Sequence, residues 1–166
     1  MAADQTDDYV AICRLQSAYA DVVTRRAWTE LTELFLADAL VEVDTQGSEV
    51  LRFEGAEALG AFIGGALERF DFFEFVILNT RIELGVGGDG QPNDDRADGR
   101  MYMCELRTDR ETGRVNNAFG VYHDRYERYD GRWQFAHRRY HSLARTGTER
   151  DLDTFAFPNH LRLGSL

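Results

Sequence analysis

The chain has 166 residues, of which 29 are acidic and 19 basic, so its formal net charge is −10. This length suits one domain, and a hydrophobic fraction of 43% can fill a core, which argues against a disordered chain. The acidity disfavours binding to nucleic acid or to an anionic membrane surface. We expect no signal segment and no membrane span, and therefore a cytoplasmic domain over residues 1–166 in which Cys13 and Cys104 are reduced thiols.

The first half of the chain shows mainly helical periodicity. Apolar side chains recur every three or four residues over 7–25, over 28–37, and over 55–70, where Gly55 opens the segment. Between the second and third of these helices, valines alternate with acidic residues over 41–44. That alternation predicts a half-buried strand, which ends at the turn Gln46-Gly47.

After residue 69 the spacing of the apolar residues changes from about 3.6, which is typical of helices, to 2, which predicts strands. We expect strands over 73–84, 101–108, 114–129 and 133–143, with a polar loop over 85–99 after the first. Helices followed by an antiparallel meander indicate the α+β class, with the helices packed on one face of the sheet.

The segment ERYDGRW sets the pairing of the last hairpin. We predict a three-residue loop, Tyr129-Asp130-Gly131, with Gly131 in the left-handed conformation. One face of this hairpin then carries Asn116, Gly120, Tyr122, Asp124, Tyr126, Arg138 and Tyr140, and the other carries Phe119, Val121, His123, Trp133, Phe135 and His137. A two-residue turn would instead move Arg138 to the opposite face.

Tyr19, Asn79 and the segments LFLADALVEV and GVYHDRYERYDGRWQFAHRRY carry a resemblance to a known family. The chain resembles the SnoaL-like branch of the NTF2-like superfamily, and is most similar there to the scytalone dehydratase, bile acid dehydratase and hexachlorocyclohexane dehydrochlorinase group. The resemblance implies a cone-shaped α+β barrel in which three N-terminal helices pack on a strongly bent antiparallel or mixed sheet. It also implies no cofactor and a closed apolar pocket for a small-molecule ligand.

Four residues are candidates for catalysis in such a pocket. The resemblance places Tyr19 and Arg138 at pocket positions of relatives, and Asp44 near a strand that bears a general base. We expect Tyr19 to act as acid or oxyanion donor, Asp44 or Asp124 as base, and Arg138 as electrostatic stabiliser. The alternatives are a core tyrosine, a solvated Asp44, and an ordinary cross-strand ion pair between Asp124 and Arg138.

Five further residues are expected to bind substrate: Thr24, Phe75, Tyr122, Tyr126 and Tyr140. In the dehydratases and dehydrochlorinases that the chain resembles, an Asp-His dyad occupies the positions of Thr24 and Phe75, and neither of these residues can act as a base. Two functions therefore stay open. One is a cofactor-free lyase or isomerase that acts on an apolar oxygenated polycyclic or aromatic metabolite. The other is a non-catalytic ligand-binding or assembly module.

His123 and His137 are predicted to be cross-strand neighbours without a third ligand, so we expect no metal site. The apolar hairpin face that they share is expected to pack against a second subunit, in a homo-oligomer (dimer or trimer), or against the C-terminal tail, residues 145–166. For the tail itself we expect either a cover over the pocket mouth or disorder.

Overall fold

The structure, a computed structural model, describes residues 5–47, 49–86 and 91–163 of the chain. The helices are α1 (Gln5–Arg25), the 3-10 helix η1 (Trp28–Glu33) and α2 (Gly55–Leu67). The strands are β1 (Phe35–Asp44), β2 (Leu51–Glu54), β3 (Phe70–Val86), β4 (Pro92–Asp109), β5 (Ala118–Tyr129), β6 (Arg132–Arg145) and β7 (Asp153–Thr154). The ends of the predicted domain, residues 1–4 and 164–166, lie outside the described residues.

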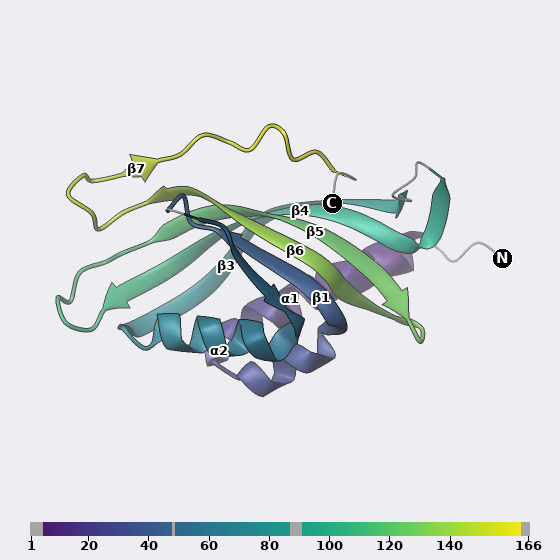
Figure 1. Ribbon diagram of the computed structural model, residues 1–166, viewed down its shortest axis with the longest axis horizontal. Helices are drawn as coiled ribbons and strands as arrows, with labels where there is room; N and C mark the ends of the chain where they lie inside the picture. Colours follow the sequence, from purple (N-terminus) through teal and green to yellow (C-terminus); the bar gives the residue numbers. More distant parts are fainter. Residues whose placement is uncertain (1–4, 48, 87–90, 164–166) are drawn as a thin grey trace.

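The strands form one curved mixed sheet in the order β2-β1-β6-β5-β4-β3, with β7 added beside β6. Only the β1–β6 pair is parallel among the described pairs, and the others are antiparallel. Figure 1 shows the helices on one face of this sheet, which we call the inner face, and the C-terminal segment along the opposite, outer face. The predicted α+β class and bent mixed sheet with three N-terminal helices are confirmed.

Helix α1 packs on the sheet through a single apolar stripe. Its buried residues follow the spacing of one helix face: Ile12, Leu15, Gln16, Tyr19, Val22 and Val23. The helix ends at Arg25. The next residue, Arg26, has a left-handed backbone (φ 60°) and donates its N–H to the carbonyl of Val23, while Ala27 donates to that of Val22. These two bonds cap the last turn and redirect the chain into η1.

Several elements of the structure differ from the prediction. The second helix is shorter than expected, because the chain becomes extended at Phe35, where β1 begins beside β6. Strand β2 was not predicted. Part of the predicted loop over 85–99 belongs to β3 and β4, and its residues 87–90 lie outside the described residues. In each case, backbone pairing with another strand outweighs the local preference of a polar or ambiguous segment.

Asp130 and Gly131 form a two-residue turn between β5 and β6. Both have positive φ (49° and 75°), as a type I′ turn requires, and Tyr129 pairs directly with Arg132. The predicted three-residue loop is therefore wrong. An aspartate tolerates the left-handed conformation, so the Asp-Gly pair supports the tighter turn, whose twist matches that of the strands.

A β-bulge in β6 then shifts the register by one residue. Ala136 has no partner in β5, because the pairing jumps from Phe135 to His137. The shift returns Arg138 to the inner face, where it lies directly opposite Asp124. The effects of the turn and the bulge on the register thus cancel, and Asp124 and Arg138 share a face as predicted.

Trp133 and Phe135 precede the bulge and lie on the inner face, not on the outer face as predicted. The Trp133 indole donates to Asp8 of α1 at 3.0 Å, and the Phe135 ring lies 5.9 Å from that of Tyr19. The prediction failed for these two residues because a bulge inverts the alternation on its two sides.

The C-terminal segment crosses the outer face (Figure 1). The ring of Phe157 stacks on Tyr102 of β4 at 6.3 Å, and the Leu161 carbonyl accepts a hydrogen bond from Arg100 at 3.3 Å. Of the two partners expected for the outer face, the described part of the tail covers a portion of it. Cys13 and Cys104 are free thiols.

Two further features concern the described residues as a whole. None of their helices combines the length and the apolar composition of a membrane span. No group of three or more of their His, Cys, Asp and Glu side chains is arranged to hold a metal ion.

Candidate functional site

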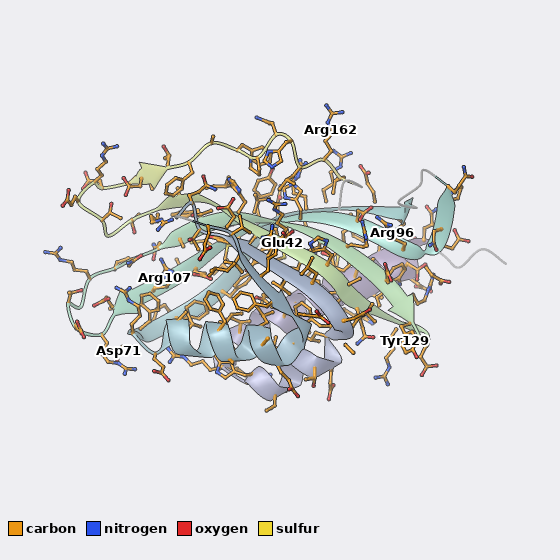
Figure 2. All side chains as sticks on the ribbon, viewed as in Figure 1. Glu42, Asp71, Arg96, Arg107, Tyr129 and Arg162 are labelled. Carbon is orange, nitrogen blue, oxygen red and sulfur yellow. The ribbon has the colours of Figure 1, made fainter. Side chains whose placement is uncertain are left out.

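Helix α2, the middle of α1 and the inner face of the sheet enclose a cavity of about 280 Å³. It lies at the end of the sheet where β1, β4 and β6 finish, the end that carries Arg107 and Asp71 in Figure 2, opposite Tyr129. Its lining is mostly apolar, with a few polar groups, as in small-molecule sites. The polar and charged lining residues are Tyr19, Thr45, Arg69, Glu105, Arg107, Tyr122, Tyr140, Ser142 and Arg145.

Three tyrosines of the lining come from three elements. Tyr19 belongs to the buried stripe of α1, Tyr122 to β5 and Tyr140 to β6, where the last two are paired across the hairpin. The ring of Tyr140 lies against Gly120, and a Cβ at this glycine would clash with it. Glycine at position 120 therefore allows Tyr140 to lie flat on the sheet beside the Tyr122 ring, 5.2 Å away.

Glu105 is the one carboxyl group among the described residues that line the cavity. It lies in β4, and its Oε2 is 3.1 Å from Nη1 of Arg107, two residues along the same strand face. Burial raises the pKa of Glu105, although the neighbouring Arg107 guanidinium lowers it in part. A carboxylate in this setting can accept a proton from a bound molecule more readily than a solvated one.

The tyrosine hydroxyls of the cavity stay protonated near neutral pH. Burial raises the pKa of Tyr122 well above its usual value and that of Tyr140 to about 12, and the charge of Glu105 adds to both effects. Burial also raises the pKa of Tyr19, against the opposing effects of Arg138 and of a hydrogen bond with Tyr122. Each hydroxyl can therefore donate a hydrogen bond to a ligand oxygen.

Asp124 and Arg138 form a fully buried ion pair on the inner face. Arg138 Nε and Nη2 donate to the two carboxylate oxygens at 2.8 and 3.1 Å, and both side chains are 0% exposed. The Tyr126 hydroxyl donates to Asp124 at 2.8 Å and accepts from Gln16 of α1 at 2.7 Å. Neither ion-pair residue nor Tyr126 is among the residues that line the cavity.

The Arg138 guanidinium lies among aromatic rings that separate it from the cavity. Its central carbon is 4.1 Å from the ring centres of Tyr19 and Tyr122 and 4.2 Å from that of Phe135. Burial lowers its pKa, but Asp124 outweighs this and holds the pKa above its usual value. Arg138 thus contacts the rings of Tyr19 and Tyr122 on the side away from the cavity and helps to hold them in position.

The other predicted site residues lie outside the cavity lining. Asp44 is at the end of β1 on the outer face, 3.3 Å from Nδ1 of His141. Thr24 and Phe75, at the dyad positions of the relatives, are neighbours in space, and the Thr24 hydroxyl accepts the backbone N–H of Phe75 at 3.0 Å. This bond joins the end of α1 to β3.

Sequence reasoning missed Glu105 and Arg107. The signal was present in the segment MYMCELRT, which was correctly predicted to be a strand. In a strand, Met101 and Met103 share a face with residues 105 and 107, so two charged side chains continue an apolar face. A charged group that interrupts such a face is a candidate for a site.

Comparison with known proteins agrees with this architecture. The sequence matches the SnoaL-like domain family over residues 4–139. No protein with a curated description matches it.

Several solved structures share the fold. A protein assigned as a scytalone dehydratase, from Novosphingobium aromaticivorans, superposes with a TM-score of 0.73 at 19% identity, covering 92% of this chain and 96% of that one. Hexachlorocyclohexane dehydrochlorinase LinA-type3 from Novosphingobium barchaimii gives a TM-score of 0.72 at 22% identity, covering 93% and 97%. At these identities the likeness establishes the fold.

Proposed function

Because the chain belongs to the SnoaL-like family, we propose that its cavity binds a small, largely apolar, oxygenated molecule and transfers a proton on it without a cofactor. The observation that carries this proposal is the carboxyl group of Glu105 in an apolar cavity beside three tyrosine hydroxyls. A volume of about 280 Å³ lies just below the roughly 300–1,000 Å³ that is usual for ligand pockets. This size favours one or two rings over a larger polycycle.

In the proposed reaction, Glu105 removes a proton from the carbon next to a carbonyl group. The electron pair of the broken C–H bond forms a C=C bond, and the carbonyl oxygen becomes an enolate, which a tyrosine hydroxyl stabilises by donating a hydrogen bond. In an isomerase the proton returns to another carbon. In a lyase the electron pair expels a leaving group from the adjacent carbon.

Several of the residues predicted from the sequence keep a role in this proposal. Tyr19, Tyr122 and Tyr140 are the proposed hydrogen-bond donors. Asp124 and Arg138 position the tyrosines from behind the cavity. We assign the role of base to Glu105 in place of Asp44 and Asp124, because a base must reach the proton that it removes.

The experiment compares the wild type with Glu105→Gln, which keeps the shape of the side chain and removes the base. Cyclic ketones of one and two rings are incubated in D₂O, and exchange of their α-protons is followed by NMR. We expect the wild type to accelerate exchange and the variant to lose about 100-fold or more of that acceleration. The matched control is Glu111→Gln, at an exposed turn, which should exchange as the wild type does. Loss of less than about threefold in Glu105→Gln would exclude this base.

A non-catalytic binding module is the second candidate function. It is favoured by Thr24 and Phe75, which form a structural hydrogen bond at positions where relatives carry an acid–base dyad. In that case the wild type would bind ketones, as seen by a thermal shift, and give no exchange above the buffer rate.

The assembly as a dimer or trimer and the cytoplasmic location stay predictions from the sequence. Native mass spectrometry at tens of micromolar tests the first, and a monomer would contradict it.

A further inference from the structure

Three arginines line the cavity, against a single carboxyl group among the described lining residues. They are Arg69, Arg107 and Arg145, and the carboxyl group is that of Glu105. The chain as a whole has a net charge of −10, so the charge around the cavity is opposite in sign to that of the rest of the molecule. Such a local field concentrates ligands of negative charge.

Two of the three arginines have carboxylate partners. Arg107 contacts Glu105 at 3.1 Å and is held further by the carbonyl and side-chain oxygens of Asn116 at 2.6 and 2.7 Å. Arg69 donates to Asp109 at 2.9 Å. The charges of these two arginines are therefore balanced within the chain.

Arg145 differs from the other two. Its guanidinium donates to the backbone carbonyl of Thr45 and lies 4.9 Å from the ring centre of Phe155. Asp153 is its cross-strand partner in β7, but neither Asp153 nor another carboxylate of the described residues forms an ion pair with its guanidinium. One positive charge thus remains without an anion at the cavity lining.

The arginines also mark the side from which a ligand enters. Arg69 is 64% exposed, and Arg107 and Arg145 are partly exposed, whereas the apolar residues deeper in the cavity, such as Leu59, are buried. Burial lowers the pKa of Arg107, and the like charges of Arg145 and Arg69 lower it further, although Glu105 opposes this. A bound anion would relieve this repulsion.

We infer that the ligand is an apolar ring system that ends in a carboxylate, with the rings inside the cavity and the carboxylate paired with Arg145. This inference rests on the proposed function and names the class of its substrate. A guanidinium binds a carboxylate through two parallel hydrogen bonds, and one unbalanced charge matches a monoanion.

The experiment uses matched pairs of probes: phenylacetate and naphthalene-2-carboxylate, each with its primary amide, titrated by calorimetry into the full chain. We expect each carboxylate to bind at least tenfold more tightly than its amide, with a preference that shrinks as salt is added. Arg145→Gln should lose at least tenfold for the carboxylates and change less than twofold for the amides. Arg145→Lys, which keeps the charge, should recover part of the loss.

Arg132→Gln, at the far end of the same strand, is the control and should bind all four probes as the wild type does. If Arg145→Gln does not fold, the carboxylate preference of the wild type and its dependence on salt decide the question alone. Equal binding of acid and amide overturns this inference and leaves the proposed function standing. Failure of all four probes to bind overturns this inference, and the exchange of ketone α-protons then decides separately whether the proposed function also fails.

Discussion

The inner and outer faces of the sheet bury charge in different surroundings. On the inner face, the Asp124–Arg138 pair is enclosed by aromatic rings, and Glu105 faces a cavity. On the outer face, charges gather in a network around Glu42, whose carboxylate lies 3.1 Å from Arg52, 3.0 Å from His137 and 3.6 Å from Arg139.

This difference separates two uses of buried charge. On the outer face, Arg52, His137 and Arg139 share the carboxylate of Glu42, so this buried carboxylate has its partners within the protein. The inner face keeps one carboxyl group and one unbalanced guanidinium at a cavity, where a ligand can use them. One strand can contribute to both faces because its successive side chains point to opposite sides of the sheet.

The largest effect should come from breaking the inner ion pair. Asp124→Asn leaves the Arg138 charge buried without a counter-charge, and we expect a loss of about 3–5 kcal/mol in the free energy of unfolding. Urea denaturation measures this loss. The double variant Asp124→Leu with Arg138→Met should recover most of the stability, because it removes both charges. A loss below about 1 kcal/mol in the single variant would show that water reaches the pair.

On the outer face, His123 should make stability depend on pH. Burial, with the charge of Arg100 added to it, lowers the pKa of His123 to about 4, whereas the unfolded chain takes up this proton near pH 6.5. The unfolded state binds more protons in this window, so the fold loses stability as the pH falls from 7 to 4, by about 3 kcal/mol from this residue. His123→Gln cannot titrate. The stability difference between wild type and variant should therefore change across that window, and a constant difference would contradict the shift.

Gly120→Ala tests the shape of the cavity wall. The new methyl group would clash with the Tyr140 ring, and we expect a loss of about 1–3 kcal/mol in the free energy of unfolding together with weaker ligand binding. Gly65→Ala is the matched control. Nothing lies near a Cβ at Gly65, inside α2, so alanine there should stabilise the protein by about 0.5–1 kcal/mol.

The smallest effect is expected from Arg52→Gln on the outer face. Arg52 is 63% exposed, and Glu42 keeps His137 and Arg139 as partners, so the loss should be about 0.5 kcal/mol or less by urea denaturation. A loss comparable to that of Asp124→Asn would remove the energetic contrast between the two faces.

Much of the fold could be predicted from the sequence, because it depends on local periodicity. The stripe of α1, the change of period after residue 69 and the strand MYMCELRT are visible in the residues alone. The common face of Tyr122, Asp124 and Tyr126 also follows from alternation within one strand. That Thr24 and Phe75 stand at the positions of an Asp-His dyad could be recognised only through the resemblance to a family.

What the tertiary structure decided is the set of relations between distant segments. The two-residue turn alone would have placed Arg138 on the outer face, and the bulge at Ala136 returns it to the inner face. No local sequence pattern predicts such a bulge. The packing of α2 over one end of the sheet created the cavity, which Glu105 lines and Asp44 and Asp124 do not. Within a strand that no bulge interrupts, the sequence by itself determined which side chains share a face, because backbone geometry imposes the alternation locally. Which face borders the cavity was decided by packing, because a cavity exists only between elements that meet in space.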